Sequence, residues 1–379
     1  MITVCYAGEQ PPEEWDASVF LAGPTPRDPG VPSWRPEAIA ELERQWDNGV
    51  LVVFVPEPAD GKRYPGYDDQ VDWEERWLDA ADTIMFWIPR AMATMPGLTT
   101  NIEFGRYESS GRVVLGAPES AERMKYLRIH ALRNGAPVTT TLADTVRMSL
   151  SPIGEGVPRS GGERFVPLKA WQSPTFRNWY AAQQNAGNTL LHGKLLWTRK
   201  AFLWVFHARM HIAAEDRVKS NEIVLGRPDV VSIVAYHPGE TVLEHQVVLV
   251  REFRLPSCSP DGYVRELPGG GVLHGEPVDQ AAHELAEETG LQVAADRLRA
   301  GQVRQAIATL SAHRVHVFTV ELTADEIASA RENPGPHGII EDSERTFVEI
   351  RSYSDILGEQ LVDWATVGVL SAAFTGPAR

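Results

Sequence analysis

Three carboxylates in this sequence are spaced so that a helix would present them on one face. Glu284, Glu287 and Glu288 occupy positions i, i+3 and i+4 of a segment with helical patterning, residues 279–289. Like charges at this spacing repel one another and disfavour a helix. Carboxylate oxygens are, however, the ligands of Mg²⁺ or Mn²⁺, which can in turn hold a pyrophosphate. With the glycines of residues 269–271 before it, the helix is predicted to bind a metal, the alternative being a solvated acidic face.

Two more carboxylates lie in the amino-terminal third of the chain. Helical spacing over residues 69–81 puts Glu74 on the apolar face, where burial would raise its pKa towards general-acid use. Glu103 is expected in the first turn of a helix that follows a strand and a polar loop, and helix starts favour anions. Donors for phosphate or sugar oxygens are found at Thr99, Thr100 and Asn101. Taken singly, Glu74 is better explained as a solvent-reaching or capping residue, and Glu103 as an acid favoured by the helix dipole; only the combination favours catalysis.

Three motifs occur in a fixed order: FLAGPTPR after the first strand, the carboxylate-bearing helix, and a T-x-x-E-F-G turn. Together they resemble the nucleoside 2-deoxyribosyltransferase superfamily, which includes nucleoside 5'-monophosphate N-glycosidases. The resemblance covers most of residues 15–150. It implies that Glu103 is the nucleophile at the anomeric carbon and that Glu74, where the family commonly has Asp, protonates the departing base. Glycosidic cleavage requires one ionised and one protonated carboxyl. Water as acceptor gives an N-glycosidase and a second base gives a transferase. We expect nucleotide hydrolysis, without a cofactor.

The loop after the first strand is expected to bind the substrate. Gly23 permits close approach of backbone to ligand, and Thr25 and Arg27 would donate to a 5'-phosphate. Trp34 either stacks on the base or anchors the loop. The family often has a tyrosine where this chain has Phe20. Candidates to replace the missing phenol are Tyr6, Tyr64 and Tyr67.

The run RELPGGGVLHGEPVDQAAHELAEETGL resembles the Nudix box of nucleoside-diphosphate-linked-moiety hydrolases. Residues 195–379 look like one such domain, nearest in style to ADP-ribose pyrophosphatases because VLVREFR precedes the box. The resemblance implies a divalent cation, Mg²⁺ or Mn²⁺, and a catalytic role for Glu287. The expected metal ligands are Glu284, Glu287, Glu288 and Glu266. Arg251, Arg254 and Arg265 are expected to contact substrate phosphates or ribose.

The box departs from the family pattern at two places. His283 replaces the arginine before the first helix glutamate, and the chain is one residue short, so that Gly275 stands where the family has its first glutamate and Glu276 follows. Arginine orients a metal-binding glutamate through charge-assisted bonds. A neutral histidine does so less firmly. Metal binding is expected, and a degenerate domain that binds nucleotide without turning it over is the alternative.

Strands and helices alternate over residues 1–150, which predicts an α/β domain with a doubly wound, mostly parallel sheet. Residues 151–164, rich in Gly, Pro and Ser, are expected to be a linker. Residues 165–379 have few helices between strands and are predicted to form an α+β Nudix-type domain, an α/β/α sandwich with a mixed sheet. Residues 165–194 would be its amino-terminal extension, whose aromatic side chains either stack on a base or pack at the interdomain surface.

The composition excludes several classes of protein. The chain has 379 residues and a formal net charge of -15, which argues against a nucleic-acid polymer as partner. Cys5 and Cys258 are too few for a disulfide framework. The acidic start lacks a signal region, and no apolar run approaches the roughly 18 residues of a membrane span. We therefore expect a cytoplasmic protein without a membrane partner, and both resemblances imply a homodimer or higher homo-oligomer.

Together these observations predict a bifunctional nucleotide hydrolase. The Nudix-like domain would split a nucleoside diphosphate derivative, and the amino-terminal domain would cleave the N-glycosidic bond of the nucleoside monophosphate released. One alternative is a deoxyribosyltransferase or N-glycosidase regulated by a degenerate Nudix domain. Others are a protein that only binds nucleotides, and a step in making a modified nucleoside.

Overall fold

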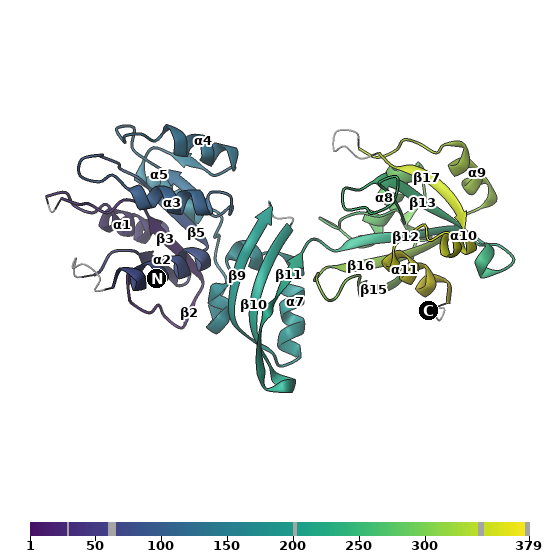
Figure 1. Cartoon of the computed structure of the whole chain (residues 1–379), viewed down its shortest axis with the longest axis horizontal. Helices are drawn as coiled ribbons and strands as arrows, with labels where there is room; N and C mark the ends of the chain where they lie inside the picture. Colours follow the sequence, from purple (N-terminus) through teal and green to yellow (C-terminus); the bar gives the residue numbers. More distant parts are fainter. Residues whose placement is uncertain (29, 60–65, 200–202, 340–344, 376–379) are drawn as a thin grey trace. The chain divides into compact units, whose positions relative to one another are not determined.

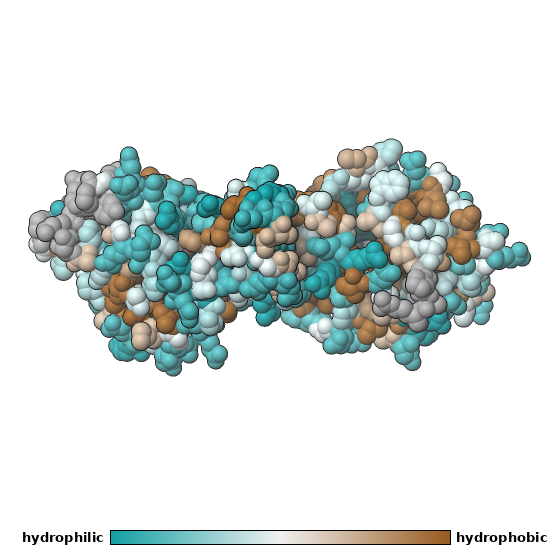
Figure 2. Space-filling model, turned by 90° about the horizontal axis from the view of Figure 1, so that it is seen from below, coloured by the Kyte–Doolittle hydropathy of each residue, from teal (hydrophilic) through white to brown (hydrophobic). Residues whose placement is uncertain are grey.

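The structure is a computed structural model that describes all residues except 29, 60–65, 200–202, 340–344 and 376–379. It divides into two compact units, Met1–Gly226 and Arg227–Arg379, which are described separately (Figure 1). On the face that Figure 2 shows, hydrophilic side chains cover most of the surface and apolar ones form small separate areas. None of the helices in the described ranges is long and apolar enough to cross a membrane.

The first unit contains a six-stranded sheet in the order β1-β4-β3-β5-β6-β7, in which every neighbouring pair is parallel. The strands are β1 (Ile2–Tyr6), β3 (Ala17–Ala22), β4 (Leu51–Val55), β5 (Thr83–Trp87), β6 (Val113–Gly116) and β7 (Val138–Thr139). The four strands between the two edge strands are buried along their whole length. Continuous apolar strands are what a parallel sheet covered on both faces requires. The predicted α/β fold is confirmed.

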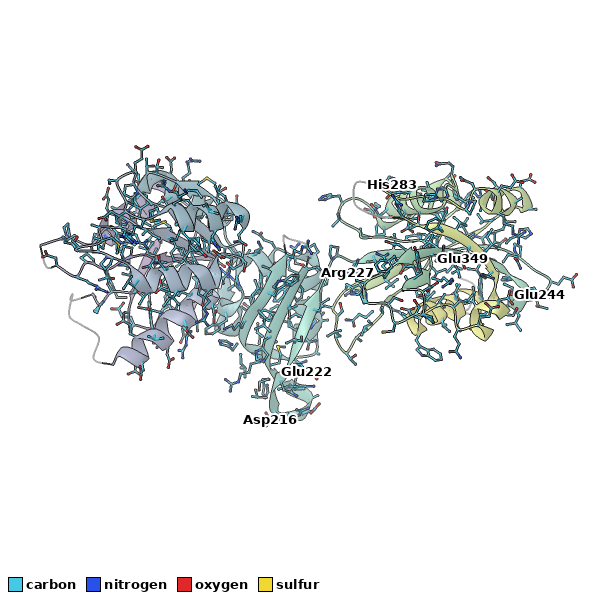
Figure 3. The ribbon with its side chains drawn as sticks, turned by 45° about the horizontal axis from the view of Figure 1, so that its top comes forward. Asp216, Glu222, Arg227, Glu244, His283 and Glu349 are labelled. Carbon is cyan, nitrogen blue, oxygen red and sulfur yellow. The ribbon has the colours of Figure 1, made fainter. Side chains whose placement is uncertain are left out.

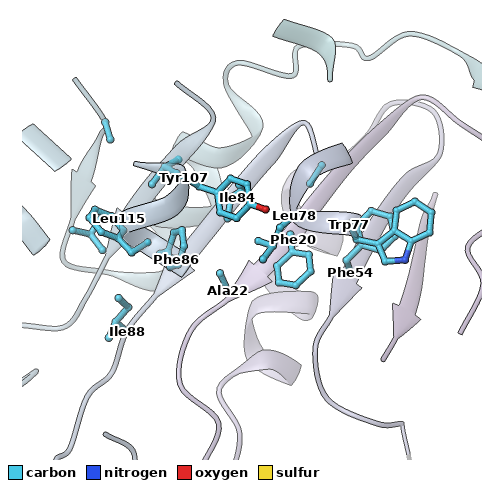
Figure 4. Packing of buried hydrophobic residues seen from close by; sticks show 14 of the residues in the cluster. Phe20, Ala22, Phe54, Trp77, Leu78, Ile84, Phe86, Ile88, Tyr107 and Leu115 are labelled. Carbon is cyan, nitrogen blue, oxygen red and sulfur yellow. The ribbon is translucent and has the colours of Figure 1, made fainter. Parts of the chain in front are cut away.

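Five helices cover the two faces of this sheet. They are α1 (Arg35–Gln45), α2 (Tyr67–Ala80), α3 (Leu98–Tyr107), α4 (Lys125–Arg133) and α5 (Leu142–Leu150). Apolar side chains of α2, α3 and α4 form one core with the sheet, and those of α1 and α5 form a second core on the other face. Figure 4 shows part of the first core, where Phe54 and Trp77 stack with ring centroids 4.7 Å apart. The sheet is therefore doubly wound.

Residues 151–226 complete the first unit. The short strands β2 (Glu14–Trp15) and β8 (Arg159–Ser160) pair, and η1 (Gly161–Phe165), α6 (Leu168–Trp171) and α7 (Pro174–Asn185) follow. The next three strands, β9 (Thr189–Arg199), β10 (Leu203–Ile212) and β11 (Arg217–Gly226), form an antiparallel sheet. The 3-10 helix η2 (Ala213–Glu215) connects β10 to β11. Phe176 on α7 is fully buried against Trp179, Trp204 and Phe206. The aromatic side chains of this segment thus pack within the unit.

The structure groups residues 151–226 with residues 1–150, whereas the sequence suggested a linker over residues 151–164 and placed residues 165–226 in the second domain. The physical reason is a buried ion pair. Arg159 Nη1 and Nη2 donate to the two carboxylate oxygens of Asp82 at 2.8 and 2.6 Å, and both side chains are essentially inaccessible. Asp82 also accepts from the backbone N–H groups of Ser18 and Leu168. Which residues make up each functional domain remains a prediction.

The second unit contains a mixed sheet in the order β14-β13-β12-β16-β15, with β17 also paired to β13. Only the β12–β16 pair is parallel among the recorded pairs of described strands. The strands are β12 (Val230–His237), β13 (Gln246–Phe253), β14 (Tyr263–Glu266), β15 (Arg299–Gln305), β16 (Arg314–Glu321) and β17 (Phe347–Ser352). The short 3-10 helices are η3 (Val242–Glu244) and η4 (Ala295–Arg297).

Helices pack on both faces of the mixed sheet. They are α8 (Pro277–Thr289), α9 (Ala324–Glu332), α10 (Tyr353–Gly358) and α11 (Trp364–Thr375). Leu285 of α8 and Ile327 of α9 belong to the core on one face, and Ile356 of α10 and Leu370 of α11 belong to the core on the other. The predicted α/β/α sandwich is confirmed.

The Arg159–Asp82 pair leads to a stability prediction. Arg159→Ala leaves the Asp82 carboxylate buried without its counter-ion, and breaking a buried pair in this way costs about 3–5 kcal/mol. We expect calorimetry to show a clearly lower thermal midpoint for the first unit. The control is Arg147→Ala, because Arg147 is 63% exposed and pairs with Asp144 on the surface. Equal midpoint shifts for the two variants would show that residues 151–168 are not held to the sheet by this pair.

Candidate functional site

A buried arginine organises the first candidate site. Arg35, in the first turn of α1, is 1% exposed. Its guanidinium donates to Leu21 O at 3.2 Å, to Gly23 O at 2.8 Å and to Thr25 Oγ1 at 3.2 Å, and it forms an ion pair with Glu57. These partners lie at the carboxyl ends of β3 and β4. The chain order reverses beside them, between β3 and β5, and ligands bind at such a point in doubly wound folds.

Three carboxylates share the field of Arg35. Glu57, Glu74 and Glu103 each act electrostatically on its guanidinium, and burial lowers the Arg35 pKa against their opposing effect. Glu57 follows β4, Glu74 lies on α2 and Glu103 lies on α3. The two carboxylates predicted from the sequence are therefore brought into one electrostatic group.

The ionisation of the two predicted catalytic carboxyls is strongly perturbed. Burial and the neighbouring Glu74 raise the pKa of Glu103 to about 7, and Arg35 partly opposes this. Burial also raises the pKa of Glu74, whereas a hydrogen bond from Gln70 Nε2 to Glu74 Oε1 at 2.8 Å opposes the rise. A buried pair of carboxyls resists holding two negative charges. Near neutral pH this pair is poised to retain one proton.

Arg35 and Glu57 were not among the residues predicted from the sequence. One signal for Arg35 was present, because Arg35, Ala38 and Leu42 share the buried face of α1 at spacings of three and four residues. An arginine on an otherwise apolar face is unusual, since arginine is rarely fully buried without a partner. Glu57, two residues beyond a fully buried strand, has no comparable local pattern.

In the loop after the first strand, Gly23 lies close to other protein atoms, and its predicted approach to a ligand stays a prediction. Gly23 has φ of +154°, and a Cβ there would lie 2.2 Å from Trp87 O and 2.7 Å from Trp34 Cζ2, so a side chain does not fit. Trp34 is 7% exposed, and its indole N–H donates to Pro24 O at 3.1 Å. This burial favours the loop-anchor interpretation of Trp34 over base stacking. Thr25 is exposed beside Arg35.

The loop after β5 meets the loop after β3. The Arg27 backbone N–H donates to Thr94 O at 2.8 Å, while the rest of Arg27 is exposed. Helix α3 begins at Leu98 after Gly97 in the left-handed conformation. Glu103 therefore lies in the second turn, and the prediction of a first-turn position was wrong by one turn.

The three predicted donors before Glu103 occupy the first turn of α3 in different surroundings. Thr99 is exposed and Thr100 is 1% exposed. Asn101 is exposed, and its Oδ1 accepts from Arg90 Nη2 at 2.5 Å. Thr99 and Asn101 therefore remain accessible to a ligand, whereas Thr100 belongs to the protein interior.

The position expected for a phenol is apolar. Phe20 is 1% exposed and packs near Phe54 and Trp73, with ring centroids 6.5 and 6.2 Å away. Among the proposed substitutes, Tyr6 lies in β1, Tyr67 begins α2, and Tyr64 lies outside the described residues.

The second candidate site surrounds the last two turns of α8, which carry Glu284, Glu287 and Glu288. Glu288 is 5% exposed and accepts from the Gly269 N–H at 2.9 Å. Burial and the carboxylates of Glu284, Glu266 and Glu252 raise its pKa well above the usual value. A Cβ on Gly270 would lie 2.0 Å from Glu284 Oε1, so this glycine lets the backbone lie against a carboxylate.

Arg254 is the cation within this acidic group. Its guanidinium donates to Glu266 Oε1 at 3.1 and 2.5 Å and lies 2.8 Å from Glu252 Oε2. Glu266 and Glu288 together raise the pKa of Arg254, although burial acts against them. The predicted phosphate-binding arginine and the predicted fourth metal ligand therefore lie in direct contact.

Glu287 has a different neighbour from the other helix carboxylates. His283 Nε2 lies 3.1 Å from Glu287 Oε2, one turn away on α8. His283 is 68% exposed and lies at the outer surface of the second unit (Figure 3). An exposed pair of this kind orients a carboxylate weakly.

Arg251 and Arg265 are brought together by Glu349 of β17. Arg251 Nε lies 3.3 Å and Arg265 Nε 3.1 Å from its two carboxylate oxygens; Figure 3 labels Glu349 on the sheet. Arg251 also lies over the ring of Tyr263, 4.5 Å from its centroid. Both arginines are engaged by protein partners, as Arg254 is.

The carboxylates around α8 are chemically suited to bind a hard divalent cation, but only some of them lie close together. Across the described part of the chain, no three His, Cys, Asp or Glu side chains are arranged to hold a metal ion. Glu266 and Glu284 nevertheless both act electrostatically on Glu288, and oxygen ligands with surplus negative charge are what Mg²⁺ prefers. Glu287, turned to His283, fits less well.

The raised pKa of Glu103 leads to a prediction about stability. Between pH 4.5 and about 7 the unfolded chain releases the Glu103 proton while the folded chain retains it, so the unfolding free energy falls as pH rises. Glu103→Gln removes this loss and should stabilise the first unit by about 3 kcal/mol above pH 7, with no difference below pH 4.5. Calorimetry across this range measures the gap. The exposed Glu119→Gln is the control, and a pH-independent gap would contradict the burial of an ionisable Glu103.

Two known protein families match the chain, one in each half. Residues 16–121 match the family described as nucleoside 2-deoxyribosyltransferase like, and residues 226–351 match the NUDIX domain. No curated protein matches the chain. NUDIX domains typically use a divalent metal such as Mg²⁺. The first match spans Gly23, Arg35 and Glu103, and the second spans Glu266 and the carboxylates of α8. The chain thus carries an amino-terminal nucleoside 2-deoxyribosyltransferase-like domain and a carboxy-terminal NUDIX domain.

Proposed function

We propose that this protein is a bifunctional nucleotide hydrolase. Its amino-terminal domain cleaves the N-glycosidic bond of a nucleoside 5'-monophosphate, and its NUDIX domain, in the style of ADP-ribose pyrophosphatases, hydrolyses a nucleoside diphosphate derivative. The observation that carries the first activity is the buried Arg35, which acts electrostatically on Glu57, Glu74 and Glu103 at the carboxyl ends of the central strands. Such a group of coupled, buried ionisable side chains is typical of acid–base catalysis.

Glycosidic cleavage proceeds in two steps. The ionised Glu103 attacks the anomeric carbon, the bond from that carbon to the base nitrogen breaks, and the proton of Glu74 passes to the departing base. Water then attacks the anomeric carbon of the glycosyl ester, Glu74 accepts a proton from that water, and Glu103 leaves as carboxylate. One nucleotide and one water give a free base and a ribose 5-phosphate. Deoxyribose follows the same steps.

Arg35 supports this chemistry without contacting the reacting bond. Its positive charge lowers the pKa of both Glu74 and Glu103 against the effect of burial. One of the two carboxyls can then ionise while the other keeps its proton. Of the two singly protonated forms, the first step uses the one with the proton on Glu74 and the charge on Glu103. Thr25 and Arg27 lie exposed on the adjacent loop, where they would bind the 5'-phosphate and hold the sugar in line with Glu103.

The NUDIX domain supplies a second hydrolytic site. Glu266, Glu284 and Glu288, joined by Glu287, would hold Mg²⁺ or Mn²⁺. The bound ion would offset charge on the pyrophosphate and activate the attacking water. Arg254 lies against Glu266 and would bind a substrate phosphate. Arg251 and Arg265, held by Glu349, would position further phosphate or ribose oxygens.

The two activities fit in sequence. Hydrolysis of a nucleoside diphosphate derivative releases a nucleoside monophosphate, which is the substrate class of the amino-terminal site. Both substrates are small nucleotides, and a homodimer or higher homo-oligomer is the expected assembly. A cytoplasmic location is part of the same proposal.

A second candidate function is a glycosidase or deoxyribosyltransferase regulated by a NUDIX domain that binds nucleotide without cleaving it. The observation that favours it is the contact of Glu287 with the exposed His283, which stands where the family pattern has an arginine. Metal-dependent product release separates the two functions, because a regulatory domain binds its ligand but releases no phosphate-bearing product.

Carboxamide substitutions test the two sites separately. Glu103→Gln and Glu74→Gln should each lower base release from nucleoside monophosphates by at least about a hundredfold, since each removes a group that acts in the transition state. Glu284→Gln should lower Mg²⁺-dependent cleavage of nucleoside diphosphate derivatives and leave base release unchanged. Chromatography with mass detection over a nucleotide panel measures both products.

The control for the first site is Glu75→Gln, because Glu75 is next to Glu74 but 47% exposed and paired with Arg106. It should retain wild-type base release. Unchanged base release in both Glu103→Gln and Glu74→Gln would refute the glycosidase assignment. Unchanged diphosphate cleavage in Glu284→Gln would refute the pyrophosphohydrolase assignment.

The His283–Glu287 pair leads to a gain-of-function prediction. His283→Arg places a permanent charge and a bidentate donor beside Glu287, which orients a carboxylate more firmly than an exposed imidazole. We expect Mg²⁺-dependent kcat to rise several-fold, with base release from nucleoside monophosphates unchanged. The control is His283→Lys, which adds charge without the fork geometry. If Mg²⁺-dependent kcat rises in neither variant, while Glu284→Gln still abolishes the same activity, the orientation of Glu287 does not limit the reaction.

A further inference from the structure

The second unit contains a cavity of about 720 Å³ between helix α11 and one face of the sheet. Its lining comes from β12, β16, β15, the loop through Gly269 and Gly270, and α11 itself. The volume falls in the range of sites for small organic ligands, roughly 300–1,000 Å³. The walls combine apolar residues such as Val317 and Val369 with polar groups, which is the composition expected for a heterocycle with a polar edge.

One end of the cavity coincides with the acidic group of the NUDIX site. Arg254, Glu266, Gly269 and Gly270 line the cavity and also surround Glu284 and Glu288. A ligand in the cavity would therefore place its phosphates at this end, beside the proposed metal ligands. The rest of the ligand would extend along the sheet.

The order of the strands gives the distance from the acidic end of the cavity to its other end, at β15. Gly270 O accepts from Val231 N on β12, β12 pairs with β16, and β16 pairs with β15. Three interstrand spacings separate Gly270 from β15, or about 14 Å. That distance leaves room for a ribose and its phosphates between the acidic end and β15, so a base would lie against β15.

A β-bulge aims a side chain of β15 at this position. The pairing of β15 with β16 shifts between Ala300 and Val303, so that Gly301 and Gln302 both face the single residue Val317. Bulges re-aim side chains and recur beside functional sites. Gln302 lines the cavity, and its Oε1 is buried with no hydrogen-bond partner in the described structure. A buried acceptor without a partner is costly, and a ligand N–H would satisfy it.

The cavity also has a second uncharged polar side chain in its lining. His313 lines the same cavity, and burial together with the nearby Arg227 lowers its pKa, so the imidazole is neutral at pH 7. Its Nδ1 lies 2.6 Å from Ser311 Oγ. Figure 3 labels Arg227 in the second unit. A neutral amide and a neutral imidazole recognise a base edge better than a phosphate.

An aromatic side chain stands at the rim of the cavity. Trp364, the first residue of α11, lines the cavity and is 88% exposed. An indole so exposed gains little from the protein itself, whereas stacking on a base is favourable and tolerant of base identity. Trp364 and Gln302 therefore offer the two contacts that base recognition needs, one non-specific and one specific.

We propose that this cavity is the base-binding subsite of the NUDIX domain, in which Trp364 stacks on the base and Gln302 selects bases that carry an amino group. The inference rests on the proposed function of the NUDIX domain and deepens it, since it names the substrate class as nucleoside diphosphate derivatives of amino-bearing bases. It concerns binding, so it is separable from cleavage.

Two ligand pairs that differ by one amino group test the inference. Full-length protein is titrated by calorimetry, with Mg²⁺, against GDP and IDP, and against ADP and the diphosphate of purine riboside; chromatography verifies that each ligand stays intact. Wild type should bind the amino-bearing member of at least one pair about tenfold more tightly. In Gln302→Leu that ratio should fall to about one. In Trp364→Ala all four affinities should fall about tenfold with the ratio kept.

Val303→Ala is the matched control, because Val303 lies next to Gln302 on β15, is 48% exposed and is outside the cavity lining. It should leave all four affinities unchanged. The inference is overturned if Gln302→Leu keeps the wild-type ratio, if wild type does not discriminate within either pair, or if no ligand binds. The proposed function has a separate test. It fails if Glu284→Gln cleaves nucleoside diphosphate derivatives as fast as wild type, whatever base preference the binding experiment shows.

Discussion

The first unit depends on keeping a guanidinium charged in a place that water does not reach. Removing Arg35 from water is costly, and burial indeed lowers its pKa. Charge-assisted bonds to Gly23 O and to Glu57 offset that cost. The same contacts fasten the loops that follow β3 and β4 to the start of α1. Because Glu74 and Glu103 lie in the same field, the position of one buried charge determines both the loop geometry and the proton count of the site.

The NUDIX site, like the first site, has more carboxylates than cations. Arg254 faces Glu252, Glu266 and Glu288, and Arg227 also acts electrostatically on Glu266, so negative charge is in excess. A divalent ion would correct that excess. Part of the chain's net charge of -15 therefore belongs to a site that attracts cations, and it need not repel an anionic nucleotide once a cation is bound.

Sequence patterns predicted the features that depend on local periodicity. The apolar runs of β3, β4 and β5 predicted the parallel sheet, and helical spacing predicted the faces that carry Glu74 and the carboxylates of α8. Features that depend on distant pairing were missed. Arg159 lies in a Gly- and Pro-rich segment that suggested a linker, yet its partner Asp82 is 77 residues away. The contacts of Arg35 and the bulge at Gln302 could not be predicted either, because they form only when strands distant in the sequence come together.

Product analysis in ¹⁸O-labelled water follows both hydrolytic steps on one substrate. The full-length protein is incubated with Mg²⁺ and a nucleoside diphosphate derivative, and the products are read by mass. If the two domains act in succession, free base accumulates with a ribose 5-phosphate that carries ¹⁸O, and a second ¹⁸O appears on a phosphate formed by pyrophosphate cleavage. Nucleoside monophosphate that accumulates with its base still attached, or a base transferred to a new sugar, would contradict successive hydrolysis.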